Sequence, residues 1–232
     1  SFDNETVGKQ QARGLQDCLL ATKAKNPIVA QLNGSPTDNN ASQFKAGSDG
    51  ILQAKYDEAQ YQKGPEQWVP DWDNEEAGVI FAQMLDQQPK IKGVLAANDG
   101  IGNAVIEVLR KRKLAGQVPV TGQDATLQGL QNILTGEQCM TVYKKIKPEA
   151  QTAANLAIKL FKGERPEAPK RIQDPESGAQ VPFISLIPQA VTRANISDVV
   201  RDGFVDKAEL CKGRYAPLCV RFGVSESPAP TQ

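Results

Sequence analysis

The sequence predicts an α/β fold in which a parallel sheet is covered by helices on both faces. Short β-prone runs alternate with helix-length amphipathic stretches along the chain, and most strand runs end in a polar loop. The clearest run, Gly93-Val94-Leu95-Ala96-Ala97, is apolar or small throughout. Such a run is typical of a strand buried on both faces, and alternating strands and helices indicate a parallel sheet.

The first two units of this pattern occupy the opening third of the chain. A strand at 28–32 ends in the dense turn cluster 33–40, and a helix is expected from about 41 to 55. A second β-prone run surrounds 67–69, followed by the loop 70–74, where Asp73 or Asn74 can cap the next helix. That helix carries apolar residues at helical spacing: Ala77, Ile80, Phe81, Met84 and Leu85.

Three further units follow. The strand at 93–97 breaks at 98–100 and leads into a helix that ends in the basic run 110–113, where cations complement the helix C-terminus. A strand at 118–121 precedes a helix at about 125–134, with Gly136 as its C-cap. A strand at 139–143 ends at Lys144, and a helix at about 148–162 has proline in its first turn.

The alternation weakens beyond residue 163. The segment 165–180 is rich in proline, glycine and charge and is expected to be a loop, and 181–187 is expected to be a strand. Short helices are expected near 196–200 and 206–210, before a cysteine loop at 211–219. We expect 225–232 to be a disordered tail.

Composition excludes several classes of function. Lys plus Arg and Asp plus Glu are both 27, so the basic bias of a nucleic-acid-binding protein is absent. No apolar run approaches the ~20 residues of a membrane helix. The chain has no histidine, which removes the commonest metal ligand and the Ser-His-Asp and Cys-His arrangements. Gly100-Ile101-Gly102 lacks the third glycine of a dinucleotide fingerprint, and we expect neither metal nor cofactor.

The four cysteines fit two disulfides in an exported protein. Three pairings are possible, and the alternative is a cytosolic protein with four buried thiols. The short loop from Cys211 to Cys219 favours a local bridge, because its glycine and proline let the chain turn back.

Polar side chains follow five successive strands. They are Asp38, Asn39, Asn40, Asp71, Trp72, Asn98, Asp99, Gln123, Asp124 and Lys144. Ligands of open parallel sheets bind beyond the carboxyl ends of the strands. Carboxylates and amides suit the hydroxyls of a neutral polyol, and an indole face suits the C–H face of a pyranose. We therefore predict that Asp38, Trp72, Asn98, Asp124 and Lys144 lie along one edge of the sheet and face one cleft.

Each of these residues has a structural alternative. Asp38, Asn39 and Asp99 can cap the helices that follow them, and for Asp99 capping is favoured over ligand contact. Trp72 can be a core or rim aromatic, and Lys144 can be a solvated surface charge. The prediction depends on their shared position at strand ends.

Five strings of this sequence resemble the xylose-binding proteins of bacterial ABC sugar importers. They are Ser1-Phe2-Asp3-Asn4, Gly34-Ser35-Pro36-Thr37-Asp38-Asn39-Asn40, Ala97-Asn98-Asp99, Thr121-Gly122-Gln123-Asp124-Ala125 and Met140-Thr141-Val142-Tyr143-Lys144. The resemblance covers nearly the whole chain. It implies a two-lobed, type I periplasmic-binding-protein fold with sugar held between the lobes, of which mostly the C-terminal lobe is present. A preceding segment of the N-terminal lobe is expected to be missing.

The resemblance also implies a domain organisation and a site. Residues 1–6 look like the first crossover, 7–143 and 189–232 like the C-terminal sugar-binding lobe, and 144–188 like a crossover with a fragment of the N-terminal lobe. The residues that carry over as sugar contacts are Asp38, Asn40, Trp72, Asn98, Asp124 and Lys144. The two-lobe topology brings Cys18 close to Cys139, so this pair is expected as a disulfide beside Cys211–Cys219.

The implied function is delivery of a monosaccharide, most of all D-xylose, to an ABC transporter permease outside the cytoplasm, without enzymatic activity. The cysteine pattern resembles actinobacterial members tethered by a lipid, so a lipid anchor on the missing N-terminal segment is expected. The main alternative is a sugar sensor that feeds a histidine kinase or chemoreceptor. The effector domain of a repressor and a glycosidase remain open, although disulfides argue against a cytosolic role. The sequence does not fix the sugar.

Overall fold

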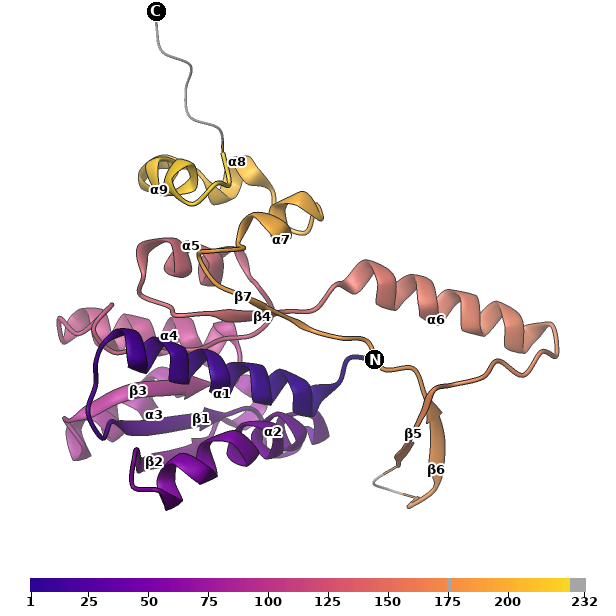
Figure 1. Cartoon of the computed structure of the whole chain (residues 1–232), viewed down its shortest axis with the longest axis horizontal. Helices are drawn as coiled ribbons and strands as arrows, with labels where there is room; N and C mark the ends of the chain where they lie inside the picture. The colour runs from indigo at the N-terminus through magenta and orange to yellow at the C-terminus, as the bar shows by residue number, and fades with distance from the viewer. Residues whose placement is uncertain (175–176, 226–232) are drawn as a thin grey trace, which may run out of the picture. The chain divides into compact units, whose positions relative to one another are not determined.

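A computed structural model describes residues 1–174 and 177–225 (Figure 1). The predicted tail beyond Ser225 lies outside the described residues. The chain forms two compact units. The larger comprises Asn4–Tyr143 and the described part of Ala190–Gln232, and the smaller comprises Ser1–Asp3 and Lys144–Gln189. The assignment of these units to two lobes stays a prediction.

The larger unit is built on a parallel sheet. Its strands β1 (Ile28–Asn33), β2 (Gln62–Trp68) and β3 (Ile91–Ala96) run in the order β2-β1-β3. Both β2 and β3 pair with β1 in parallel, which confirms the predicted sheet. The strand expected at 118–121 is reduced to one parallel bridge between Val94 and Val120. Pro119 has no N–H to donate. The Thr121 N–H donates to the Val94 C=O, but the Thr121 hydroxyl bonds to the Ala96 N–H and C=O.

Helices cover both faces of the sheet, as predicted (Figure 1). They are α1 (Asn4–Ala21), α2 (Asn39–Asp57), α3 (Asn74–Gln87) and α4 (Asp99–Lys111). Val29 and Leu95 pack with α1 and α2, whereas Ala30, Leu32 and Val94 pack with α3 and α4. This separation follows from the period of two in a strand, which sends successive side chains to opposite faces.

The helices α1 and α2 cross so closely that glycine is required at the crossing. A Cβ at Gly8 would overlap the Phe44 carbonyl oxygen, and a Cβ at Gly47 would overlap the Glu5 carbonyl oxygen. Gly50 lies one turn further along α2, and a Cβ there would meet nothing within 4 Å. The two glycines of α2 therefore form a matched pair for substitution.

We expect Gly47→Ala to lower the free energy of unfolding by about 2 kcal/mol, because an added methyl forces the backbones apart. Gly50→Ala is expected to raise it by roughly 0.5–1 kcal/mol, because alanine favours the helix and meets no neighbour. Urea unfolding of both variants measures the difference. Equal effects of the two substitutions would contradict the close crossing.

The remaining helices of the larger unit form a second core. They are α5 (Leu127–Thr135), α7 (Ser197–Arg201), α8 (Lys207–Leu210) and α9 (Ala216–Arg221), beside the strands β4 (Thr141–Tyr143) and β7 (Gln189–Val191). Gly136 caps α5 in the left-handed conformation at φ 86°, as predicted. The short helices expected near 196–200 and 206–210 are present as α7 and α8. The cysteine loop holds a 3-10 turn (Gly213–Tyr215) and the start of α9.

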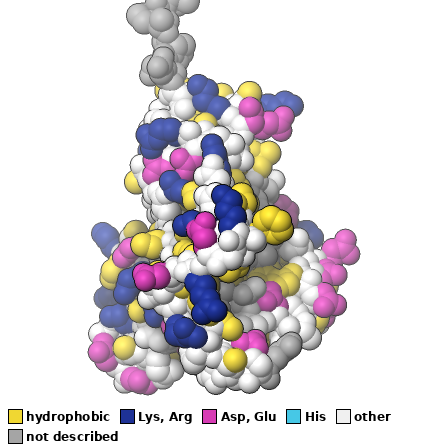
Figure 2. Space-filling model, turned by 90° about the vertical axis from the view of Figure 1, so that its right-hand side faces the viewer, with side chains coloured by type: hydrophobic (Ala, Val, Ile, Leu, Met, Phe, Trp, Pro, Cys, Tyr) yellow, Lys and Arg dark blue, Asp and Glu magenta, His cyan; other side chains and the backbone are white. Residues whose placement is uncertain are grey.

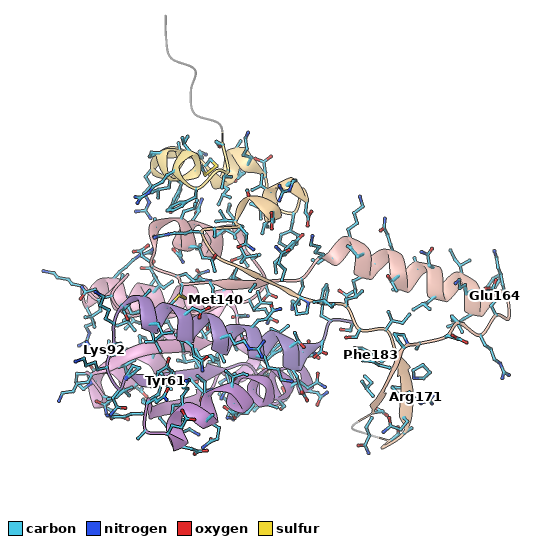
Figure 3. All side chains as sticks on the ribbon, viewed as in Figure 1. Tyr61, Lys92, Met140, Glu164, Arg171 and Phe183 are labelled. Carbon is cyan, nitrogen blue, oxygen red and sulfur yellow. A yellow bond between two sulfur atoms is a disulfide. The ribbon has the colours of Figure 1, made fainter. Side chains whose placement is uncertain are left out.

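The smaller unit contains the helix α6 (Ile146–Phe161) and a hairpin of β5 (Lys170–Gln173) and β6 (Gln180–Phe183). The expectation of a loop over 165–180 is wrong for β5, and the strand expected at 181–187 ends at Phe183. Arg171 and Phe183 mark the two strands in Figure 3. None of the α6 residues is buried in the described chain, and Leu160 and Phe161 are 62% and 94% exposed.

Candidate functional site

The carboxyl ends of β1, β2 and β3 meet at one edge of the sheet, and polar residues follow each of them. Asp38 follows β1 and caps α2 by accepting from the Asn40 N–H at 2.8 Å. Trp72 follows β2, and its indole Nε1 donates to the other oxygen of Asp38 at 3.2 Å. Asp38 therefore caps α2, which was the predicted structural alternative to ligand contact, and it also orients the Trp72 indole.

Trp72 ends the 3-10 turn η1 (Pro70–Trp72) and is half-buried. Its ring meets Phe44 edge to face, with 6.5 Å between the ring centroids. A Cβ at Gly34 would overlap the indole, so Trp72 can lie here only because Gly34 has no side chain. The backbone N–H of Asp71 donates to the Ser35 hydroxyl at 3.3 Å, which ties η1 to the same turn.

Two pairs of consecutive residues at this edge adopt left-handed backbone conformations without being glycine. Asp71 and Trp72 have φ of 50° and 59°, and Asp124 and Ala125 have φ of 96° and 50°. Each such residue costs on the order of 1–3 kcal/mol, and such strain gathers at functional sites. Hydrogen bonds hold the second pair: Asp124 N–H donates to Val142 C=O at 2.8 Å, and Ala125 N–H donates to the Thr141 hydroxyl at 3.2 Å.

Asn40 lies exposed in the first turn of α2. The Asn4 side-chain amide donates to Asn40 Oδ1 at 2.8 Å and to Gln43 Oε1 at 2.9 Å. These bonds fix the orientation of the Asn40 amide, so that its NH₂ group is directed away from Asn4 as a donor.

The roles of Asn98 and Asp99 differ from expectation. Asn98 caps α4 by accepting from the Ile101 N–H at 2.8 Å, so the capping role favoured for Asp99 is wrong. Asp99 is fully buried and accepts from the Thr126 N–H at 2.8 Å and the Thr126 hydroxyl at 3.0 Å. It also accepts from Gln138 Nε2 at 2.7 Å and the Thr141 hydroxyl at 2.8 Å. Asp99 therefore holds the loop that carries Asp124.

Glycines make room for this carboxylate. A Cβ at Gly122 or Gly129 would overlap an Asp99 oxygen. The buried amide of Gln11 was missed by the sequence analysis; it donates to the carbonyls of Ala96, Ala97 and Gly122 at 2.9–3.2 Å. Gln11 lies on α1 among apolar neighbours, and only its complete burial, at 0% exposure, distinguishes it from a surface glutamine. It joins the ends of two neighbouring strands and so positions the loops that follow them.

The pKa of Asp99 is raised from 3.8 to about 6, because burial disfavours the charged form more than the four hydrogen bonds favour it. The folded protein thus binds this proton more tightly than the unfolded chain does. Stability from Asp99 is fully present below about pH 4 and is lost as the pH rises through about 6. The whole effect is at most roughly 3 kcal/mol.

We expect Asp99→Asn to remove this dependence. The free energy of unfolding of the unmodified protein minus that of the variant should decrease as the pH rises from 4 to 7. Because each curve is measured under the same conditions, the titration of the other carboxylates cancels in the difference. Urea unfolding across this range measures it, and parallel curves would show that Asp99 has an ordinary pKa.

Lys144 directly follows β4 and is half-buried, and it begins the second segment of the smaller unit. Its position relative to Asp38 and Trp72, and the cleft expected to include it, stay predictions.

Lys and Arg side chains are interspersed with Asp and Glu on the face that Figure 2 shows. In the described ranges, 1–174 and 177–225, no cluster of three His, Cys, Asp or Glu residues is placed to hold a metal ion. Over the same residues, no helix is both long and apolar enough to cross a membrane.

Both expected disulfides are present. Cys18–Cys139 joins α1 to the segment before β4, with 6.4 Å between the Cα atoms. Met140, labelled in Figure 3, packs against α1, where a Cβ at Gly14 would lie 2.6 Å from its Cγ. Cys211–Cys219 closes the short loop, with 5.8 Å between the Cα atoms. The alternative of four free thiols is therefore wrong.

Comparison with known proteins identifies similar chains. Residues 1–165 match the family model described as a periplasmic binding protein domain. The chain is 39% identical over 217 residues to the D-xylose-binding periplasmic protein of Escherichia coli. It is 29% identical over 226 residues to the multiple sugar-binding periplasmic receptor ChvE of Rhizobium radiobacter. These alignments cover 90% and 91% of this chain but only 62% and 64% of the relatives.

A solved structure shares the fold. The carbohydrate transporter solute binding protein of Chloroflexus aurantiacus, in complex with D-glucose, aligns with a TM-score of 0.81 at 25% identity. The alignment covers 90% of this chain and 68% of that protein. The solute binding protein of Clostridium phytofermentans, with bound β-D-glucose, aligns at 0.77 and 23% identity, which supports the fold alone. The comparisons thus agree with the parallel sheet and its two layers of helices.

Proposed function

The chain belongs to the periplasmic binding protein domain family, and from this premise we propose that it binds a monosaccharide at the carboxyl edge of its sheet. The observation that carries the proposal is the pair formed by Asp38 and the Trp72 indole N–H at 3.2 Å. The pair combines a carboxylate, which accepts from sugar hydroxyls, with a flat apolar surface for the C–H face of the ring. Asn40 adds an oriented amide beside it.

Each Asp38 oxygen keeps capacity for a sugar hydroxyl. One oxygen accepts from the Asn40 N–H and the other from Trp72 Nε1, and a carboxylate oxygen has room for more than one donor. Asn98 and Asp124 follow neighbouring strand ends and provide further polar groups. The site binds and releases its sugar unchanged, because the similar chains are named as a binding protein and a receptor.

D-xylose is the proposed ligand, and an ABC transporter permease is the proposed recipient. The relatives named for D-xylose binding are 39% and 35% identical to this chain. Other similar proteins are solved with D-glucose or D-allose, or are named for several sugars, so ligand choice varies among them. Two disulfides and the periplasmic relatives support an extracytoplasmic location.

A titration of the chain with four sugars tests this proposal. We expect D-xylose to quench or shift tryptophan fluorescence at lower concentration than D-glucose, L-arabinose or D-ribose. In D-ribose and L-arabinose one hydroxyl has the opposite configuration, which removes one hydrogen bond worth ~1 kcal/mol net, or roughly fivefold in affinity. D-glucose instead adds a hydroxymethyl group, which a site fitted to D-xylose would have to accommodate. Calorimetry should give the same order of affinities for the four sugars. Tighter binding of another of these sugars would reject D-xylose, and no response to any sugar at millimolar concentration would reject the site.

A further inference from the structure

A cavity in the larger unit lies at the edge of the sheet opposite to Asp38 and Trp72. It has a volume of about 450 Å³, within the range of small-molecule sites. Pro119 and Cys139 line the cavity. Pro119 directly precedes Val120, which pairs with Val94, and Cys139 lies just before β4. The cavity is therefore at the amino ends of these strands, whereas Asp38 and Trp72 follow carboxyl ends.

One cation lines this cavity. Arg193 Nε donates to the Ile133 carbonyl at 2.8 Å, and its guanidinium carbon lies 5.1 Å from the centroid of the Phe222 ring. A Cβ at Gly136 would overlap Arg193 Nη2, so the guanidinium occupies space that only glycine leaves. The guanidinium is therefore held by a hydrogen bond from Nε and by the contact of its flat face with the Phe222 ring. Its two terminal nitrogens remain for a ligand.

The charge of Arg193 is not balanced by a neighbouring acid. No described carboxylate forms an ion pair with it, and no Asp or Glu lines the cavity. Burial and the nearby Arg221 both lower the pKa of Arg193, so an anion beside the guanidinium would be stabilised. Glu137, which lies between the lining residues Gly136 and Gln138, is engaged by Arg110 at 2.6 Å.

The rest of the cavity wall is largely apolar. It includes the Cys18–Cys139 disulfide, Ala21, Pro119 and Ala194. Thr22 and Thr192 are the only hydroxyl-bearing residues among those that line it. One fixed guanidinium beside apolar walls suits a ligand that has a single negative charge and a compact apolar body.

We propose that this cavity binds a small organic monocarboxylate, with the carboxylate held by the Arg193 guanidinium and the apolar body against the disulfide and Pro119. A carboxylate matches the two parallel N–H donors of the guanidinium edge, and one arginine balances one negative charge. The site is separate from the sugar edge and does not depend on the proposed function.

Benzoate is the probe, since it joins a carboxylate to a compact apolar ring, and benzamide is its uncharged counterpart. Saturation-transfer NMR and calorimetry on the full chain should show benzoate binding at least tenfold tighter than benzamide. Benzoate should also shift the Arg193 Nε–H resonance. Equal binding of benzoate and benzamide would overturn the proposal on the unmodified protein, without any variant.

Three variants locate the site. Arg193→Lys keeps the charge but loses the paired donors, and we expect at least tenfold weaker benzoate binding. Arg214→Lys is the matched control, because Arg214 stacks on Tyr215 and does not line the cavity. Ala21→Trp fills the cavity from an exposed position on α1 without touching the buried core, and should abolish binding. Unchanged benzoate binding in Ala21→Trp, with a native circular dichroism spectrum, would place the probe elsewhere.

Discussion

Removing the Cys18–Cys139 disulfide is expected to lower the free energy of unfolding by about 5 kcal/mol. The two cysteines are 121 residues apart, so the bridge closes a large loop in the unfolded chain and lowers the conformational entropy of the unfolded ensemble. Because the net stability of a domain is about 5–15 kcal/mol, the Cys18→Ser/Cys139→Ser variant should be close to unfolding at room temperature.

The second disulfide is the matched control. Cys211 and Cys219 are only 8 residues apart, and the same loop-closure argument gives about 2.5 kcal/mol. Urea unfolding of the two double-serine variants, at equal protein concentration, compares the bridges directly. A larger loss from the Cys211→Ser/Cys219→Ser variant would mean that loop size does not govern stability here.

Replacing Trp72 by alanine is expected to weaken D-xylose binding by roughly 30- to 150-fold, or about 2–3 kcal/mol. The substitution removes the indole face from the sugar ring and the N–H that orients Asp38. Trp68 provides the control, since it ends β2 and makes no hydrogen bond to Asp38 through its indole. Trp68→Phe should change the dissociation constant less than twofold by calorimetry.

Gly34→Ala gives an independent check of the same contact. Its methyl group would overlap the indole and displace it, although Trp72 itself is unchanged. We expect weaker D-xylose binding, with most of the effect in affinity and little in stability, because the η1 loop lies at the surface. If Trp72→Ala and Gly34→Ala both bind as the unmodified protein does, the indole is a structural aromatic and the sugar lies elsewhere.

Elements marked by local patterns were predictable. The strands β1 and β3 carry apolar runs, and α3 and α4 show helical spacing of apolar residues after a capping residue. β5 was missed because its residues, Lys170-Arg171-Ile172-Gln173, are mostly polar and all exposed. It is a strand through its pairing with β6, where Ile172 lies opposite Val181, and such pairing leaves little trace in a polar segment.

The sequence by itself determined that Asp38, Trp72 and Asn98 follow strand ends, because strands, turns and caps depend on residues only a few positions apart. Only the tertiary structure decided that Trp72 donates to Asp38 and that Asp99 accepts from Thr126, Gln138 and Thr141. Those partners lie 27 to 42 residues beyond Asp99 in the chain. By local rules, a carboxylate next to an asparagine, such as Asp99, is either a helix cap or a ligand contact. Folding buries Asp99 among hydrogen-bond donors that are distant in sequence, and its carboxylate therefore holds the loop that carries Asp124.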